Sequence, residues 1–220
     1  METPEMLKVS LVLSTFMDTK EHILKSAEEL FFRYGVKSVT MDDIATHLGM
    51  SKKTIYHFFK DKDELLSQFA KTFVNRHIGA FEHVCKLSKN SIDEIFCVMK
   101  HLRSLFLQMN PKLFFDLQKY YPHAWQQLRD FREKHVAEMI QKNLENGIKQ
   151  GLYRSDLNII ILAKLRLEEI EMAMNPTIFP MDKFNITQVQ LTLFEHFLYG
   201  ICTLKGHKLV NKYKQTIEKE

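Results

Sequence analysis

The sequence of 220 residues contains few of the residues that end helices and build turns, with seven glycines and five prolines. A fold of many short strands needs frequent turns, and glycine and proline supply most of them. Their scarcity excludes a turn-rich β fold and favours an all-α chain. The length is sufficient for one large domain, or for a small domain joined to a larger one.

Cysteine is scarce as well. Cys85, Cys97 and Cys202 are odd in number, lie far apart in the sequence and form no CxxC pair. A disulfide framework or a thiolate metal site would need paired or closely spaced cysteines. We therefore expect three reduced, buried cysteines and a cytoplasmic protein.

The sequence contains no apolar run of membrane-spanning length, so we expect no contact with a membrane. A short apolar patch lies near the N-terminus, but the residues before it are acidic, whereas a signal peptide begins with basic residues. We interpret residues 1–18 as an N-terminal extension, which either has a packing role of its own or results from the choice of an upstream start site. The first helix of the following domain is then expected to begin at Thr19, a suitable capping residue.

Sequence signatures of catalysis are absent too. The sequence has no HExxH, GxGxxG, Walker-type or GxSxG motif, and no ExxH pair that could hold two irons. Glu168, Glu169 and Glu171 form the one dense carboxylate cluster, and an exposed helix face explains this cluster better than acid–base catalysis does. We expect no enzymatic activity, no metal and no cofactor.

A succession of helix starts and stops is present between residues 40 and 66. Thr40 is placed to cap a short helix together with Asp43, and Gly49 can end that helix in a left-handed turn. Ser51 can then cap a second short helix after a connection of only a few residues. The pattern therefore predicts a helix-turn-helix unit.

The residues that open the second short helix suit contact with DNA. The net charge of +4 permits nucleic-acid binding without requiring it, so the positions of the basic residues matter more than their number. Lys52 and Lys53 can donate to guanine, and the methyl group of Thr54 can contact thymine. Behind them, phosphates can be held by Tyr56, His57, Lys60 and Lys62. The alternative for the two lysines is an ordinary solvated helix face.

Most residues of this unit also match a family pattern: Thr40, Asp43, Ile44, Ala45, Gly49, Ser51, Thr54, Tyr56, Phe59, Lys62, Leu65 and Leu66. At this spacing, residues 24–66 closely resemble the DNA-binding domain of TetR-family transcriptional regulators. The resemblance implies that Thr40 and Tyr56 contact phosphates, that residues 52–54 face bases and that Lys62 anchors the next helix. Phe58 departs from the pattern, because members often carry a phosphate-binding His or Tyr there. The candidate DNA-binding residues are Thr40, Ser51, Lys52, Lys53, Thr54, Tyr56, His57 and Lys62.

The resemblance implies an all-α chain of about nine helices, with a DNA-binding domain at residues 19–66 and a ligand-binding and dimerisation domain at residues 67–220. A long helix from Asp61 is expected to connect the two. The last two helices, expected at residues 157–174 and 187–208, are more apolar than one buried face requires. We expect them to form a homodimer, with Gly200 allowing close approach.

The chain is rich in soft apolar side chains, with 17 phenylalanines and 11 methionines. These side chains suit a pocket for an apolar ligand, although ordinary core packing is the alternative for each of them. Polar groups on mostly apolar helices need partners and are also candidates. The candidate ligand-binding residues are Phe106, Met109, Phe115, Trp125, Phe131, His135, Arg166 and Glu169.

These features predict a dimeric transcriptional regulator that responds to a ligand. We expect it to act as a repressor on a pseudo-palindromic operator of double-stranded DNA. A small, largely apolar or amphipathic molecule would release it by favouring one of two conformers. The alternative is a helical DNA-binding regulator that is controlled by a protein partner and has no small-molecule ligand.

Overall fold

The computed structural model describes residues 4–110 and 112–217, and their side chains from residue 18 to residue 215 apart from residue 111. Within these residues the chain is helical, with one isolated antiparallel bridge between Tyr153 and Cys202. No helix in this part of the chain combines the length and the apolar composition that crossing a bilayer requires. The predicted all-α fold is confirmed.

The helices follow one another in a simple order. They are α1 (Pro4–Tyr34), α2 (Met41–His47), α3 (Lys52–Phe58), α4 (Lys62–Leu87), α5 (Ser91–Gln108), α6 (Lys112–Tyr120), α7 (Pro122–Phe131), the π-helical segment η1 (Arg132–Val136), α8 (Ala137–Lys149), α9 (Ile159–Ala173), α10 (Ile186–Ile201) and α11 (Leu204–Ile217). Because α7, η1 and α8 continue without a break, the described residues form ten continuous helices where about nine were expected.

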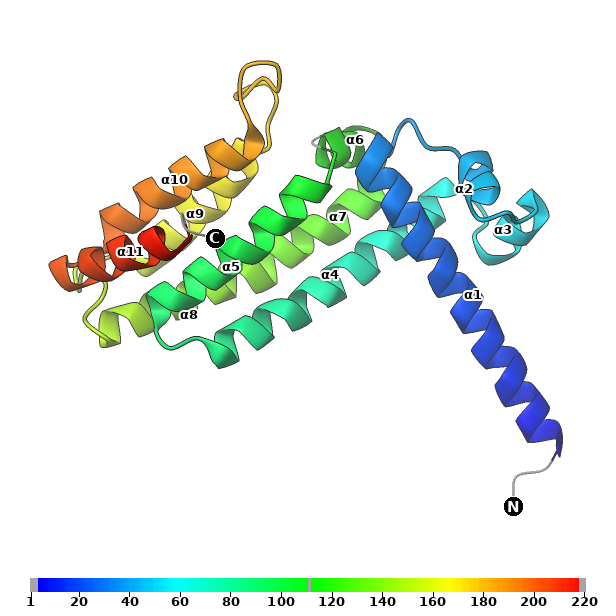
Figure 1. The fold of residues 1–220 in the computed structure, drawn as a ribbon, viewed down its shortest axis with the longest axis horizontal. Helices are drawn as coiled ribbons and strands as arrows, with labels where there is room; N and C mark the ends of the chain where they lie inside the picture. Colours follow the sequence, from blue (N-terminus) through cyan, green and yellow to red (C-terminus); the bar gives the residue numbers. More distant parts are fainter. Residues whose placement is uncertain (1–3, 111, 218–220) are drawn as a thin grey trace.

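The molecule is elongated, with a small head at one end (Figure 1). The head consists of α1, α2, α3 and the start of α4, and the long helices α4, α5, α7 and α8 run from it toward the group formed by α9, α10 and α11. The short helix α6 lies beside the head, at the end of α5. The long helix α4 therefore joins the head to the rest of the chain, as expected.

Helix α1 is longer than expected. It begins at Pro4 and continues to Tyr34, so Thr19 lies inside a helix instead of at its start. Proline is favourable in the first turn of a helix, and residues 5–34 contain no glycine or further proline that would end it. The backbone of the expected extension is thus helical from residue 4 onward, and residues 1–3 lie outside the described part.

The buried core of the head continues into α6 and α7. Ile23 and Phe31 of α1, Ile44 of α2 and Ile55 of α3 are fully buried in the same cluster as Leu117 of α6. A second cluster joins α5, α8, α10 and α11 around Ile92, Phe96, Met99, Leu144, Phe194, Leu198 and Val210. The head is therefore packed directly onto the neighbouring helices, and burial of these apolar side chains is the main force that holds it there.

The end of the chain differs from the expectation. Helix α10 stops at Ile201, and a further helix, α11, follows where one helix to residue 208 was expected. The chain turns at Cys202, which adopts an extended conformation, and the hydroxyl of Thr203 accepts a hydrogen bond of 3.2 Å from the backbone N–H of Gly206. Gly206 lies against the carbonyl of Leu152, where a Cβ atom would come within 2.2 Å of the oxygen.

Burial of the cysteines is also only partly as expected. All three are free thiols, with Cys202 buried and Cys85 half-buried, but Cys97 is exposed. Helix α5 turns Phe96 and Met99 into the core, and Cys97 lies on its other side. The prediction of a buried Cys97 is therefore wrong.

Two helical glycines provide a test of this packing. A Cβ at Gly147 of α8 would lie 2.0 Å from the buried ring of Tyr153, whereas a Cβ at Gly79 of α4 would meet nothing within 4 Å. We expect Gly147→Ala to lower the free energy of unfolding by about 2 kcal/mol through overpacking. Gly79→Ala should raise it by about 0.5–1 kcal/mol, because alanine is the better helix former. Urea unfolding of both variants measures the difference, and equal effects would contradict the packing.

Candidate nucleic-acid interface and ligand cavity

Helix α2 begins with a reciprocal cap. The backbone N–H of Asp43 donates to the Thr40 hydroxyl at 3.1 Å, and the backbone N–H of Thr40 donates to the Asp43 carboxylate at 2.8 Å. The Thr40 hydroxyl also donates to this carboxylate, at 2.7 Å, and these hydrogen bonds lower the pKa of Asp43. The predicted capping box is present, and it fixes the start of α2 at the surface of the head.

The turn between α2 and α3 is tight. Gly49 adopts a φ of +63°, the left-handed conformation that glycine tolerates best. Ser51 then caps α3 by accepting a hydrogen bond of 3.1 Å from the backbone N–H of Thr54. Ile55 is fully buried and anchors α3 to the core, so the polar first turn of α3 is left facing solvent.

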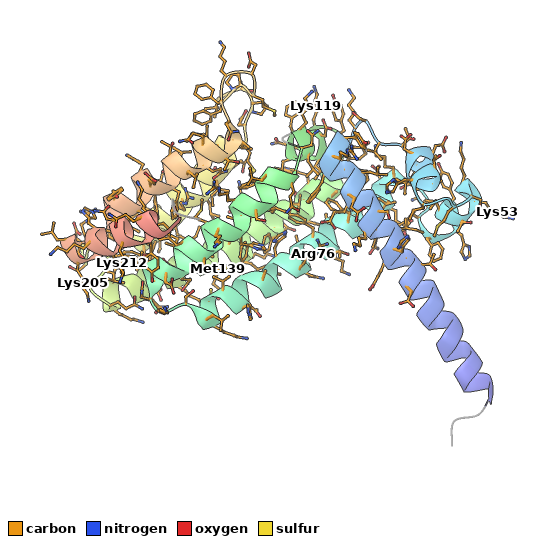
Figure 2. The ribbon with its side chains drawn as sticks, in the orientation of Figure 1. Lys53, Arg76, Lys119, Met139, Lys205 and Lys212 are labelled. Carbon is orange, nitrogen blue, oxygen red and sulfur yellow. The ribbon has the colours of Figure 1, made fainter. Side chains whose placement is uncertain are left out.

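The two lysines that open α3 differ in their surroundings. Lys52 pairs with Asp42 of α2, and this hydrogen bond raises the pKa of Lys52. Lys53 is exposed and has no hydrogen bond or ion pair among the described residues. Figure 2 shows Lys53 at the far tip of the head, pointing away from the rest of the molecule. Of the two, Lys53 is ready to contact a ligand without first breaking an ion pair.

The neighbouring candidate residues are also accessible. Tyr56 is 49 % exposed and His57 is exposed, with the imidazole of His57 packed edge-on against Phe58 at a ring distance of 5.5 Å. Phe58 is half-buried against the head core. The structure thus brings Ser51, Thr54, Tyr56 and His57 to one short helix whose other side is buried.

Lys62 has different surroundings from those expected of a phosphate contact. Its ammonium donates to the backbone carbonyl of Val36 at 2.6 Å and lies 5.3 Å from the centre of the Tyr121 ring. Burial lowers the pKa of Lys62, although Asp116, Asp43 and Asp63 act in the opposite direction. The side chain joins the loop after α1 to the end of α6, because a half-buried ammonium needs such partners. The resemblance alone did not reveal this contact.

Helix α6 holds the loop between α1 and α2 through several polar contacts. The buried carboxylate of Asp116 accepts a hydrogen bond of 3.0 Å from the backbone N–H of Lys37, whose ammonium donates to the Tyr120 hydroxyl at 3.2 Å. Gly35 lies close by, where a Cβ would be 3.4 Å from the Asp116 carboxylate. The backbone N–H of Asn110 donates to the Phe32 carbonyl at 2.6 Å. We call these contacts, together with that of Lys62, the α6 junction.

A cavity of about 130 Å³ lies between α4, α5, α6, α7 and α9. Its wall is almost entirely apolar and is dominated by rings, so we call it the aromatic cavity. The ring side chains in the wall are Phe73, His77, Phe81, Phe106, Phe114, Trp125 and Phe131. Aliphatic side chains and the polar residues Arg129, Arg132 and Glu171 complete it.

Two buried nitrogen atoms in this wall have no hydrogen-bond partner within the described residues, Nε2 of His77 and Nε of Arg132. The other ring nitrogen of His77, Nδ1, is 3.0 Å from Nε2 of His101, so these two imidazoles share a hydrogen bond. Burial, followed by the charges of His101 and Arg76, lowers the pKa of His77 to about 4. His77 is therefore neutral at physiological pH, and its Nε2 has no hydrogen-bond partner in the part of the chain that the structure describes.

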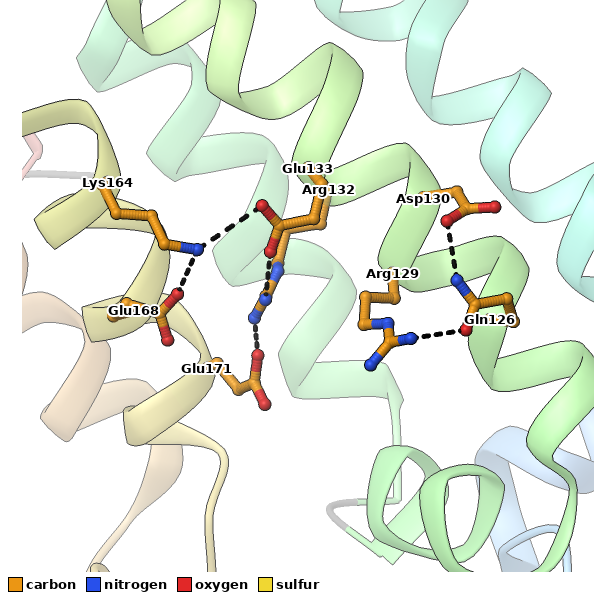
Figure 3. Close-up of polar contacts among 8 residues, drawn as sticks. All are labelled: Gln126, Arg129, Asp130, Arg132, Glu133, Lys164, Glu168 and Glu171. Atoms are coloured by element: carbon orange, nitrogen blue, oxygen red, sulfur yellow. Dashed lines mark hydrogen bonds and ion pairs between the residues drawn. The ribbon is translucent and has the colours of Figure 1, made fainter. Parts of the chain in front are cut away.

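The charge of Arg132 is balanced by carboxylates, as Figure 3 shows. Arg132 belongs to the π-helical turn η1 and pairs with Glu171 of α9 and, at 2.7 Å, with Glu133. Glu133 also lies 3.5 Å from Lys164, which pairs with Glu168 at 2.8 Å. Such π-helical turns are often found at functional sites. This network ties η1 to α9 and leaves no uncompensated charge on Arg132.

A smaller cavity of about 80 Å³ adjoins the first. Arg166 lines it, and we call it the Arg166 cavity. Arg166 is buried, pairs with Glu169 at 3.2 Å and lies over the rings of Phe194 and Phe197. Glu169 therefore balances the charge of Arg166, and the two rings cover part of the flat face of its guanidinium.

The predicted ligand-binding residues are distributed over several environments. Phe106, Trp125 and Phe131 line the aromatic cavity, and Arg166 with its partner Glu169 belongs to the neighbouring one. His135 lines a separate surface groove, Met109 is buried in the head core, and Phe115 is 37 % exposed on α6. The structure thus brings Phe106, Trp125 and Phe131 together and leaves Met109 and Phe115 apart from them. His135 lies outside the cavity, with its ring 5.9 Å from that of Phe131.

Three residues of the aromatic cavity that were not predicted as ligand-binding residues recur at a regular spacing in the sequence. Phe73, His77 and Phe81 recur every four positions on α4, which places all three on one face of the helix. A histidine within an aromatic stripe of this kind is the signal that could have identified His77. Arg132 has no comparable signal, because its place in the cavity depends on the π-helical turn.

Comparison with known proteins identifies relatives of both parts of the chain. Residues 23–69 match the family of bacterial regulatory proteins, tetR family. The uncharacterised HTH-type transcriptional regulator YhgD of Bacillus subtilis is 27% identical over 156 residues, which cover 68% of this chain and 81% of that protein. The HTH-type transcriptional repressor KstR2 of Mycolicibacterium smegmatis is 21% identical over 149 residues, which cover 64% of this chain and 70% of that protein.

A solved structure has the same fold. The transcriptional regulator FadR of Bacillus subtilis, solved in complex with stearoyl-CoA, superposes with a TM-score of 0.61 at 18% identity. The superposition covers 81% of this chain and 97% of that one. At this identity the likeness extends to the fold alone. It includes the helices beyond residue 69, which the family match does not cover.

The neutral His77 leads to a prediction about pH. The pKa of His77 is about 4 in the folded chain and near 6.5 in the unfolded chain. Between pH 4 and pH 6.5 the imidazole is therefore mostly protonated in the unfolded chain and mostly neutral in the folded chain. The stabilisation is complete above pH 6.5 and is lost as the pH falls toward 4. Between about pH 7 and pH 4.5 we expect the free energy of unfolding to fall by about 2 kcal/mol more in the unsubstituted protein than in His77→Phe.

Urea unfolding at the two pH values measures this difference. The control is His135→Phe, which removes an exposed imidazole and should keep the pH dependence of the unsubstituted protein. If His77→Phe and the unsubstituted protein lose the same stability on acidification, His77 is not held neutral by its surroundings.

Proposed function

Because the chain is a member of the TetR family, we propose that it is a ligand-responsive transcriptional regulator that binds a pseudo-palindromic DNA operator as a homodimer. We further propose that it represses transcription and leaves the operator when a small molecule binds. The relatives carry the names of transcriptional regulators and, in one case, of a repressor, and none of those names is that of an enzyme. Such a regulator would act in the cytoplasm, where bacterial DNA lies.

The observation that carries the DNA-binding role is the exposed first turn of α3. Its cap and its buried Ile55 hold it in place, and Lys53 projects from it with no hydrogen bond or ion pair to the residues that the structure describes. A helix presented in this way can enter the major groove by its N-terminal end. Thr40, Ser51, Lys52, Thr54, Tyr56 and His57 lie on the same short stretch of the head and are proposed to hold bases or phosphates beside it.

Lys62 is given another role in this proposal. Its ammonium is engaged with the carbonyl of Val36, so we propose that it positions the head and does not reach a phosphate. Removal of Lys62 would then weaken DNA binding by loosening the α6 junction. The Phe58 position, where a phosphate donor is missing, makes the exposed His57 next to it the better candidate for a phosphate contact.

Dimerisation is proposed through α9 and α10. Ile160, Ile161 and Leu165 of α9 are 74 %, 62 % and 47 % exposed, which is unusual for three apolar side chains on one helix. Gly200 of α10 has open space around its Cα, so another helix could approach it. A pair of such faces forms a two-fold interface, and two heads could then reach successive major grooves about 34 Å apart.

The aromatic cavity is the proposed ligand site, because its wall joins the parts that must move together. Phe114 of α6 lies in this wall, and the same short helix holds the loop between α1 and α2 through Asp116. Glu171 of α9 lies in it as well. A ligand that changes the position of α6 would therefore change the placement of the head relative to the dimer helices.

Selection of operators from random DNA tests the proposal as a whole. We expect a palindromic site to be enriched and its complex to contain two copies of the chain. Recovery of no preferred sequence would refute specific DNA binding. An operator complex that no small molecule releases would instead favour control by a protein partner.

Lys53→Ala tests base reading by α3. We expect it to weaken binding to the selected operator by about tenfold or more, and to lower affinity for random DNA much less, because one base contact carries about 1–3 kcal/mol of discrimination. Lys208→Ala removes an exposed lysine on α11, at the opposite end of the molecule, and should leave both affinities unchanged. Titrations at matched salt measure both constants, and equal loss on both DNAs would contradict base reading by Lys53.

Ile161→Asp tests the dimer. A charge in the centre of the proposed interface should convert dimers to monomers and reduce operator affinity by at least about tenfold, since a buried unpaired charge costs several kcal/mol. Leu87→Asp is the control, because Leu87 is 69 % exposed at the end of α4 and outside this face. Sedimentation of both variants gives the assembly state, and a dimeric Ile161→Asp variant would refute the proposed face.

A further inference from the structure

The size of the aromatic cavity limits what it can hold. Its volume is about 130 Å³. An engineered apolar cavity of about 150 Å³ in another protein takes up benzene, so a single six-membered ring is the appropriate size here. The wall contains the rings of Phe73, Phe106, Phe114 and Trp125, which can pack edge-on or offset against a flat guest.

The boundary with the Arg166 cavity strengthens this size limit. Phe81, Leu102, Val136 and Ile170 line both cavities and therefore form the partition between them. A ligand longer than one ring would have to displace this partition or extend out of the open side of the cavity. Phe81 is buried and stacked on Phe131 with their ring planes 5° apart, so the partition is well packed.

The two unpartnered nitrogen atoms in or beside the cavity define the polar part of the ligand. Nε of Arg132 carries a proton and can only donate. Nε2 of His77 donates or accepts according to the tautomer that its hydrogen bond to His101 selects. A hydroxyl oxygen can satisfy either atom in either tautomer, whereas a carbonyl oxygen can accept from Arg132 and, only in the tautomer that carries the proton on Nε2, from His77 as well. A ligand without oxygen leaves both nitrogens unsatisfied, which is unfavourable in an apolar site.

The charges around the cavity argue against an ionic ligand. A carboxylate would compete with Glu171 and Glu133, which already pair with Arg132. An ammonium would lie in a wall that includes the cationic Arg129 and Arg132, and it could not accept a hydrogen bond from Arg132. Either ion would lose its hydration in a nearly apolar cavity. Arg132 is already paired, so a carboxylate would find its counter-charge only at the exposed Arg129, whose guanidinium donates to Gln126.

We propose that the aromatic cavity binds a neutral molecule made of one aromatic ring with a hydroxyl or carbonyl oxygen, which bonds to His77 or Arg132. This inference rests on the proposed function, because it names the chemical class of the effector. The apolar ring occupies the space between Phe73, Phe106 and Trp125, and the oxygen satisfies the buried nitrogens.

Four probes of similar shape test the class: benzyl alcohol, toluene, benzoate and benzylammonium. Trp125 is the single tryptophan of the chain and lines the cavity, so its fluorescence reports binding directly, and calorimetry gives the dissociation constants. We expect benzyl alcohol to bind about threefold to tenfold more tightly than toluene, the usual effect of one buried hydrogen bond. It should bind at least about tenfold more tightly than either ion.

His77→Phe tests the contact itself. The variant keeps a ring in the wall and removes both nitrogens, so we expect the preference for benzyl alcohol over toluene to shrink while the affinity for toluene stays within about twofold. His47→Phe makes the same exchange on an exposed residue of α2, outside the cavity, and should keep the full preference. Thermal unfolding shows whether each variant is folded. If His77→Phe is not folded, the ranking of the four probes on the unsubstituted protein decides.

Three results would overturn the proposal. Equal affinities for toluene and benzyl alcohol would show that the ligand oxygen makes no favourable contact. Tighter binding of benzoate or benzylammonium would show that the cavity prefers a charged ligand. No change in Trp125 fluorescence with any probe would exclude binding in the cavity. These titrations contain no DNA. A protein that binds benzyl alcohol but selects no operator would refute the regulatory role alone, and one that selects an operator but fails these titrations would refute the ligand class alone.

Discussion

The placement of the head depends on the α6 junction. Asp116 is buried, and its carboxylate accepts a hydrogen bond from the backbone of the loop between α1 and α2, while Lys62 donates to the same loop from the start of α4. A buried carboxylate and a half-buried ammonium lose water and must keep such partners. Rotation of the head relative to α6 and α4 would break these two hydrogen bonds. Apolar packing alone fixes the orientation of the head less strictly, because it has no preferred direction.

The aromatic cavity lies directly behind this junction. Phe114 belongs to the same short helix as Asp116, and Glu171 connects the other side of the cavity to α9 through Arg132. One small site is thus in contact with the helix that holds the head and with the helix proposed for dimerisation. Coupling between ligand and DNA would require only that the ligand favour one position of α6 over another.

The helix-turn-helix of the head could be predicted from the sequence almost residue by residue. Its caps at Thr40 and Ser51 and its left-handed turn at Gly49 are local features, because each depends on residues no more than a few positions away. The cavity could be predicted only in part. Phe106 and Trp125 reach it, but Phe115 lies on the outer side of α6, because composition does not reveal which face of a helix is covered.

The helical class, the helix-turn-helix and the exposed start of α3 follow from local sequence patterns, since hydrophobic spacing and capping act within one or two turns of a helix. The partner of Lys62, the extra turn at Cys202 and the opposite environments of Gly79 and Gly147 depend on contacts between distant segments of the folded chain. Both glycines have the same local helix propensity. Only packing against Tyr153, six residues farther along and on the far side of a turn, distinguishes them, because steric contact depends on the assembled fold.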